Sequence, residues 1–208
     1  MQTNESICQA LMKGRAAEVK QLVSQALAEG IPPAEILNNG LLQGMGIIGG
    51  KFKKNEVYVP EVLIAARAMK AGMEILKPRL VAAGVQPLAT AVIGTVKGDL
   101  HDIGKNLVGM MLEGAGLRVV DAGIDVSPAR FVQLAKENKA QVIGVSALLT
   151  TTMTNMKSVV DAMKASGTKT KVMIGGAPVT QAFCDEIGAD GYAPDAASAA
   201  DLARKLVA

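Results

Sequence analysis

Residues 89–104, ATAVIGTVKGDLHDIG, change from an apolar run to a polar loop. The run is short and rich in Val and Ile, which is typical of a strand buried on both faces of a sheet. After the loop, apolar residues return at helical spacing from Ile103 to Ala115. A strand, a polar loop and a helix in this order predict the first repeat of a parallel α/β sheet.

The same alternation continues to the end of the chain. Further strand-like runs are Arg118–Ala122, Gln141–Ala147, Lys171–Gly175 and a short one near Gly191 and Tyr192. Helical stripes span Phe131–Ala135, Met153–Met163 and Asp195–Val207. We therefore predict a doubly wound, flavodoxin-like or Rossmann-like α/β domain over residues 89–208, with five parallel strands and right-handed crossovers.

Residues 1–85 show only helical periodicity. Four amphipathic stripes fall at Ser6–Lys13, Val19–Leu27, Ile36–Ile48 and Val59–Leu80. The segment from Pro78 to Ala89 contains two prolines and a glycine and suits the end of the last helix and a linker. The sequence predicts a four-helix bundle followed by the α/β domain.

Composition excludes several classes of function. Lys and Arg outnumber Asp and Glu by 22 to 19 with no basic stripe, so nucleic acid is not an expected partner. No apolar stretch is long enough for a membrane span and the start lacks a leader pattern, so we expect a cytoplasmic protein. Cys8 and Cys184 lie far apart and in no metal-ligand spacing, which predicts free thiols.

Ligands of open α/β sheets bind outside the carboxyl ends of the strands. Three segments follow such ends here: the loop from Gly98 to Gly104, the hydroxyl-rich stretch Ser146–Thr152, and the pair Gly175 and Gly176. In the common strand order 2-1-3-4-5 the three strands are neighbours. We expect the three segments to converge on one crevice.

The loop after the first strand lacks the glycine patterns of nucleotide-binding loops. It offers His101 with Asp99 two residues before it, so that the carboxylate can accept the Nδ1–H and leave Nε2 for a metal. One histidine cannot hold a metal alone. The other ligands would come with a cofactor, as in the planar ring of a corrinoid. Asp102 is expected to cap the following helix.

The stretch DLHDIG, Asp99–Gly104, resembles the DxHxxG motif of cobalamin-binding domains. Extended to GDLHDIGKNLVGMMLEGAG, it is similar to cobalamin-dependent methionine synthase and to corrinoid proteins of methyltransferase systems. The resemblance also covers Ser146, Leu148 and Thr150, the pair Gly175 and Gly176, and a helical part around Tyr58 that is similar to the four-helix cap of methyl carriers.

The resemblance implies a site for cobalamin, as methylcobalamin or a related corrinoid, with His101 as the lower ligand of cobalt. Asp99 and Thr152 would complete a proton relay, with threonine where the family usually has serine. Gly104, with the later glycines and hydroxyls, would frame a channel for the cofactor tail. The residues expected to contact the cofactor are Gly98, Asp99, His101, Asp102, Ile103, Gly104, Ser146, Leu148, Thr150, Thr152, Gly175, Gly176 and, over the upper face, Tyr58, with Met45 a further candidate in the cap.

The function that the resemblance implies is that of a non-catalytic methyl carrier in one-carbon metabolism. A substrate-specific methyltransferase would load it, a second methyltransferase would unload it to tetrahydrofolate or a thiol, and a reductive activase would maintain it. A subunit of an adenosylcobalamin mutase shares DxHxxG but generally lacks the helical cap. A cobalamin-dependent sensor would need an output domain. A cofactor-free response-regulator-like domain leaves the joint motifs unexplained.

Overall fold

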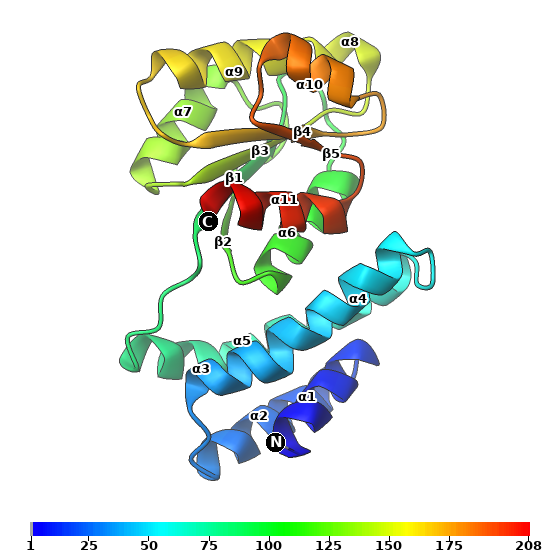
Figure 1. Ribbon diagram of the computed structural model, residues 1–208, viewed down its shortest axis with the longest axis vertical. Helices are drawn as coiled ribbons and strands as arrows, with labels where there is room; N and C mark the ends of the chain where they lie inside the picture. Colours follow the sequence, from blue (N-terminus) through cyan, green and yellow to red (C-terminus); the bar gives the residue numbers. More distant parts are fainter. Residues whose placement is uncertain (1) are drawn as a thin grey trace. The chain divides into compact units, whose positions relative to one another are not determined.

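The structure is a computed structural model that describes residues 2–208 (Figure 1). It divides into two compact units, with the boundary in the chain between Pro87 and Leu88. No helix in the described part of the chain is long and apolar enough to cross a membrane.

The first unit is entirely helical. Its elements are α1 (Gln2–Met12), α2 (Ala16–Ala28), α3 (Pro33–Ile36), the π-helical η1 (Leu37–Leu42), α4 (Gln43–Lys53) and α5 (Val59–Ala82). Because α3, η1 and α4 follow one another without a break, the described residues of this unit form four helical rods, as the periodicity predicts. The core contains fully buried apolar side chains such as Ile7, Leu11, Val19, Ile36 and Leu41.

One detail of this unit differs from the prediction. The π-helical segment η1 was not predicted; Gly40 lies within it and packs against α1, where an added Cβ would lie 3.0 Å from Cγ2 of Ile7. The helix α5 continues through Pro78 and ends at Ala82, within the segment expected to hold its end and the linker. At the other end of α5, the amide of Tyr58 donates to Oε2 of Glu61 across 3.0 Å and fixes the first turn.

The second unit is a five-stranded sheet with helices on both faces (Figure 1). The strands are β1 (Thr90–Thr95), β2 (Arg118–Asp121), β3 (Val142–Ser146), β4 (Lys171–Gly175) and β5 (Gly191–Ala193). They pair in parallel in the order β2-β1-β3-β4-β5, which is the predicted topology. Its register places Thr95 at the end of β1 beside Ser146 at the end of β3.

Six helices connect the strands or end the chain. They are α6 (Ile103–Gly114), α7 (Pro128–Glu137), α8 (Thr150–Met153), α9 (Asn155–Ala165), α10 (Gln181–Ile187) and α11 (Ala196–Val207). Figure 1 shows α6 and α11 on one face of the sheet and α7, α9 and α10 on the other. The sequence predicted neither α10 nor the short α8, which lies in a segment expected to be a loop.

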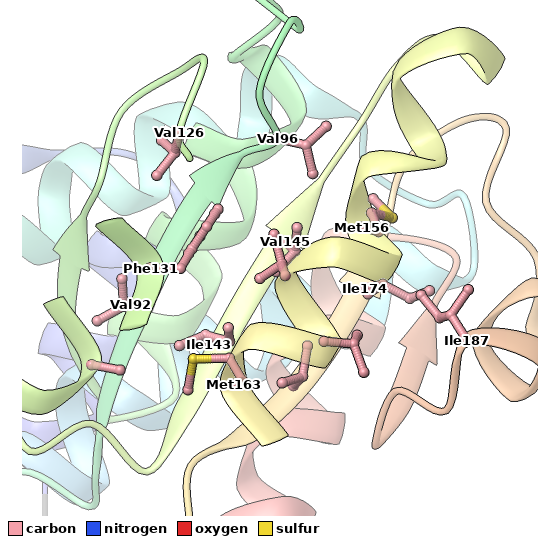
Figure 2. Packing of buried hydrophobic residues seen from close by; sticks show 14 of the residues in the cluster. Val92, Val96, Val126, Phe131, Ile143, Val145, Met156, Met163, Ile174 and Ile187 are labelled. Atoms are coloured by element: carbon pink, nitrogen blue, oxygen red, sulfur yellow. The ribbon is translucent and has the colours of Figure 1, made fainter. Parts of the chain in front are cut away.

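Figure 2 shows the core between the sheet and the second of these helical layers. Phe131 of α7 is fully buried and lies over Gly94 of β1, where a Cβ would come within 2.8 Å of its ring. The thioethers of Met156 and Met163 fill the space along α9. The core is aliphatic and rich in methionine, as expected for a chain with so few aromatic residues.

Candidate functional site

Asp99 joins the loop after β1 to the segment after β3. Its side chain is fully buried. Oδ1 lies 2.8 Å from Nδ1 of His101 and accepts from the His101 amide across 3.1 Å. Oδ2 accepts from the hydroxyl of Thr152 at 2.6 Å and from the amide of Leu148 at 2.8 Å. Both carboxylate oxygens are therefore occupied by donors.

These donors decide the charge of Asp99. Burial by itself raises the pKa of the carboxyl, because it disfavours the ionised form. The hydrogen bonds from Thr152, Leu148 and His101 outweigh burial and hold the pKa well below its usual value. Asp99 is an anion at neutral pH, so the ring of His101 donates to it through Nδ1–H.

His101 turns the rest of its ring away from Asp99. Half of its side chain remains exposed, and Nε2 takes no hydrogen-bond partner among residues 2–208. The backbone of His101 is also fixed to the end of β1, because Thr95 Oγ1 donates to the His101 carbonyl oxygen across 2.9 Å. Ser146 Oγ lies 3.0 Å from Thr95 Oγ1 and extends this contact to β3.

Three supporting residues were missed by the sequence analysis. Thr95 is fully buried and reads in the sequence as an ordinary β-branched strand residue. Asp125 accepts from the Gly98 amide at 2.7 Å, and Asn155 donates to the carbonyl oxygen of Lys97 at 2.8 Å. Asp125 and Asn155 come from other connections of the sheet, and only the fold brings them to this loop.

Large apolar side chains lie exposed on the segments that carry or contact the His101 loop. They are Leu100, Ile103, Ile124, Leu148 and Leu149. Ile103 is 79 % exposed and Leu100 68 %, on either side of His101 in the sequence. Exposed apolar residues gathered beside a polar group are typical of a ligand-binding surface. This surface suits a broad, partly apolar ligand that meets Nε2.

Asp102 and Thr150 have surroundings that differ from the prediction. Asp102 stands at the N-cap of α6 but does not cap it; its Oδ2 accepts from the side-chain amide of Asn106 at 3.1 Å. The expected capping interaction is wrong. Thr150 was expected in a loop but is the first residue of the short helix α8. Its side chain is exposed.

The three glycines of the expected tail channel differ in their surroundings. A Cβ added at Gly104 would meet nothing within 4 Å, so this position opens to space. A Cβ at Gly175 would lie 3.0 Å from the carbonyl oxygen of Ala193, and one at Gly176 1.9 Å from that of Ala147. Close backbone packing requires glycine at Gly176 whether or not a ligand lies beside it, and Gly175 is closely packed as well.

Two of the predicted contact residues lie in the first unit. Tyr58 precedes α5 and is 63 % exposed, so its side chain is available to a ligand or partner. Met45 is only 1 % exposed and packs in the bundle core. Unlike Tyr58, its side chain is not exposed in this structure.

The donor set around His101 fits a metal only if the metal brings its other ligands. Across residues 2–208, no three side chains of His, Cys, Asp or Glu gather into a group that could hold a metal ion. A single imidazole with a carboxylate behind it can supply one axial ligand. A corrinoid would bring the remaining metal ligands in its own ring, and the exposed apolar side chains on these loops would suit the apolar part of that ring.

Comparisons with known proteins agree with this donor set. The B12 binding domain family matches residues 89–201, and a second family of that description matches residues 3–77. Dimethylamine corrinoid protein 3 of Methanosarcina acetivorans is 42 % identical over 97 % of this chain and 95 % of its own length. Trimethylamine corrinoid protein 1 of the same organism is 45 % identical over 92 % of this chain and 88 % of its own length.

Solved structures give the same result. The methanol:cobalamin methyltransferase complex of Methanosarcina barkeri contains a chain that matches with a TM-score of 0.89 and 30 % identity, over 99 % of this chain and 80 % of that one. A cobalamin-binding protein of Desulfitobacterium hafniense matches with a TM-score of 0.82 and 32 % identity, over 99 % and 98 % of the two chains. The chain belongs to the B12-binding corrinoid proteins of methyltransferase systems, and its cofactor is a cobalamin-type corrinoid.

Proposed function

We propose that this protein carries a methyl group between two methyltransferases on a corrinoid held by Nε2 of His101, with the cofactor's own lower base released. The observation that carries the proposal is the buried Asp99, which receives His101 on one oxygen and Thr152 on the other. When bound, the corrinoid supplies the cobalt that accepts and releases the methyl group.

The Asp99 carboxylate prepares His101 to be a ligand. Because it accepts the Nδ1–H across 2.8 Å, the neutral ring has its lone pair on Nε2. The hydrogen-bonded carboxylate also fixes the plane of the ring. The ring therefore needs little reorganisation to ligate a metal.

The contact between Asp99 and His101 can also couple ligation by Nε2 to the uptake or release of a proton. A proton on Nε2 blocks ligation, and Asp99 Oδ1 keeps its contact with Nδ1–H whether or not Nε2 carries that proton. Thr152 has one proton to donate, and its hydroxyl lies 2.6 Å from Asp99 Oδ2 and 3.0 Å from the Leu149 carbonyl oxygen. Thr152 therefore provides the oxygen for which the family usually uses serine.

Other residues are assigned to the cofactor by position. We propose that Leu100, Ile103 and Leu148 contact the ring, and that the tail passes the open position at Gly104 and the hydroxyls of Ser146 and Thr150. We propose that the cofactor tail also passes close to the backbone where side chains are absent, at Gly98, Gly175 and Gly176. The proposed role of the first unit is to cap the upper face, with Tyr58 as its contact.

Relatives indicate which partners to test. Their names include dimethylamine and trimethylamine corrinoid proteins, and one related structure is a methanol:cobalamin methyltransferase complex. We therefore propose methylated amines as the first class of methyl donor and methanol as the second. The proposed acceptor side is a second methyltransferase that uses tetrahydrofolate or a thiol, and a reductive activase would restore protein whose cobalt has been oxidised.

The ligand is tested by electron paramagnetic resonance of the protein loaded with cob(II)alamin. In uniformly ¹⁵N-labelled protein with unlabelled cofactor, an axial nitrogen from the protein gives a doublet splitting, whereas the cofactor's own base gives a triplet. We expect the doublet in the wild type and its loss in His101→Ala. Lys97→Ala, an exposed change in the same loop, is the control and should keep the doublet. A triplet in the wild type would refute histidine ligation.

The carrier role needs a separate measurement. The reduced, loaded protein is incubated with a methylated amine and its methyltransferase, and methylation of the cofactor is followed in the visible spectrum. We expect about one methyl group per protein and its later transfer to tetrahydrofolate or a thiol by a second enzyme. Failure of the loaded protein to take a methyl group from methylated amines and from methanol would contradict the proposal.

A further inference from the structure

The segment between β2 and α7 continues the sheet towards the His101 loop. Ala122 donates its amide to Ile93, Thr95 donates to the carbonyl oxygen of Gly123 across 3.0 Å, and Val126 donates to Thr95 across 2.9 Å. Parallel pairing with the end of β1 therefore continues beyond the last residue of β2. Residues 122–126 are fixed along the edge of the site.

The start of this segment is anchored by a buried lysine. Lys105 on α6 has a side chain only 3 % exposed, and its Nζ lies 2.5 Å from Oδ2 of Asp121. The other oxygen of Asp121 accepts from the amide of Gly123 at 2.8 Å. The Asp121 side chain is half exposed while Lys105 is buried, and their contact joins this end of the segment to α6.

Asp125 connects residues 122–126 to Gly98 and Asp99 in the His101 loop. Its Oδ1 accepts from the amide of Gly98 at 2.7 Å, and its own amide donates to the carbonyl oxygen of Asp99 at 3.1 Å. Asp125 has a φ of 52°, a left-handed conformation that Asp, Asn and Gly adopt more readily than other residues. Gly98 is also left-handed, with a φ of 84°.

We propose that Asp125 is a positioning residue for the cobalt ligand, acting through Gly98 and Asp99 on His101. Without an acceptor at Asp125, the glycine at position 98 is free to change conformation and the backbone of Asp99 moves with it. The carboxylate then no longer presents both oxygens to His101 and Thr152, and the ring loses its fixed tautomer and plane. The part that concerns cobalt rests on the proposed ligation by His101.

Three substitutions separate the possible roles of Asp125. Asp125→Asn keeps an acceptor oxygen and tolerates the left-handed backbone but removes the charge. Asp125→Gly keeps the backbone freedom and removes the acceptor. Asp161→Ala is the matched control, because Asp161 is an exposed aspartate whose side chain pairs with Lys157 on α9.

The first readout is made on the protein without cofactor. His101 is the only histidine among the 208 residues, so long-range ¹H–¹⁵N spectra report its ring alone. We expect the Nδ1–H tautomer to dominate in the wild type, in Asp125→Asn and in Asp161→Ala. In Asp125→Gly the ratio of this tautomer to the other should fall by about fivefold, as expected for the loss of one hydrogen bond.

The second readout is the fraction of loaded protein that shows the ¹⁵N doublet at fixed pH. The ratio of ligated to unligated protein should fall about fivefold in Asp125→Gly and change less than about twofold in Asp125→Asn. Equal effects of the two variants would overturn the proposal, since they would assign the effect to charge. A wild-type result for Asp125→Gly in both readouts would overturn it as well.

The two readouts keep this inference distinct from the proposed function. If wild-type protein shows no ¹⁵N doublet, ligation by His101 is wrong, and the tautomer ratio still decides whether Asp125 positions the ring. If the doublet is present and the tautomer ratio does not respond to Asp125→Gly, ligation stands and the positioning role is wrong.

Discussion

The hydroxyl of Thr152 lies 2.6 Å from Oδ2 of Asp99, although the two residues are 53 positions apart in the chain. Asp99 lies in the loop after β1 and contacts His101, whereas Thr152 lies on α8, which follows β3. Because β1 and β3 are neighbours in the sheet, the ends of both strands reach the same place. A contact between two loops thus depends on the strand order.

Loss of the Thr152 hydroxyl should destabilise the protein. In Thr152→Val the side chain keeps its shape, but the buried Asp99 carboxylate loses a donor. A hydrogen bond to a charged group contributes about 1.5–3 kcal/mol, so the free energy of unfolding should fall by this amount at pH 7. Thr152→Ser keeps the hydroxyl and should cost about 1 kcal/mol for the lost methyl group.

Urea unfolding of the cofactor-free protein measures these differences. Thr154→Val is the matched control, since Thr154 is exposed and its hydroxyl donates only to the carbonyl oxygen of Thr151, at 3.3 Å. We expect it to change stability by less than about 0.5 kcal/mol. A cost for Thr152→Val no larger than that of the control would show that the contact with Asp99 is not made in solution.

Asp99 should make stability depend on pH in the acid range. Its folded-state pKa lies below its ordinary value of 3.8, so above that value the carboxylate is ionised in both states and contributes its full stabilisation. As the pH falls below it, only the unfolded chain takes up the proton. The free energy of unfolding then decreases by up to about 1.4 kcal/mol per pH unit.

Urea unfolding of the wild type and of Asp99→Asn over this range isolates the effect. Asparagine does not titrate, so its unfolding curves lack this one contribution. We expect the stability advantage of the wild type to shrink as the pH falls. An advantage that stays constant down to pH values well below the ordinary pKa of aspartate would mean that Asp99 is not held as a buried anion.

Sequence patterns predicted the sheet and most helices because these depend on local periodicity. Most of the strand runs are apolar and rich in Val and Ile, and the helical stripes repeat at helical spacing. The helix α10 was missed because its seven residues are too few for a helical period to stand out. The π-helical turn of η1 was missed because its side-chain pattern differs little from that of an α-helix.

The candidate site was predictable only where its residues are close in sequence or belong to the family motif. The Asp99–His101 contact follows from a spacing of two residues in a loop. Thr95 and Asp125 were missed because their roles arise from hydrogen bonds across the sheet, and neither residue type is unusual in its segment. Asp102 stands where a cap is expected but bonds to Asn106 instead, a choice between two local donors that spacing does not decide.

Gly176→Ala should be severely destabilising without any cofactor. The new Cβ would overlap the carbonyl oxygen of Ala147, and φ at Gly176 is 135°. Gly167→Ala is the control for backbone strain alone: φ is 70° and no atom lies within 4 Å of the new Cβ. The control should cost about 1–2 kcal/mol and Gly176→Ala more than about 3 kcal/mol in urea unfolding. Equal costs would indicate that β3 and β4 separate easily at this point.

Gly104→Ala should show the opposite pattern. The position lies in the first turn of α6 without neighbours around a new Cβ, and alanine is favoured over glycine in a helix by up to about 1 kcal/mol. The cofactor-free variant should therefore be as stable as the wild type or slightly more so. If the cofactor tail passes this position, affinity for cobalamin should fall in Gly104→Ala and further in Gly104→Leu.

Fluorescence quenching or equilibrium dialysis with cobalamin measures that order, and unfolding of the same preparations shows that each variant is folded. The comparison separates a glycine needed by the fold from one needed by the ligand, which the sequence alone treats alike. Gly104→Leu that binds cobalamin as tightly as the wild type would place the tail elsewhere, and the open space at Gly104 would then reflect only its position on the surface of the helix.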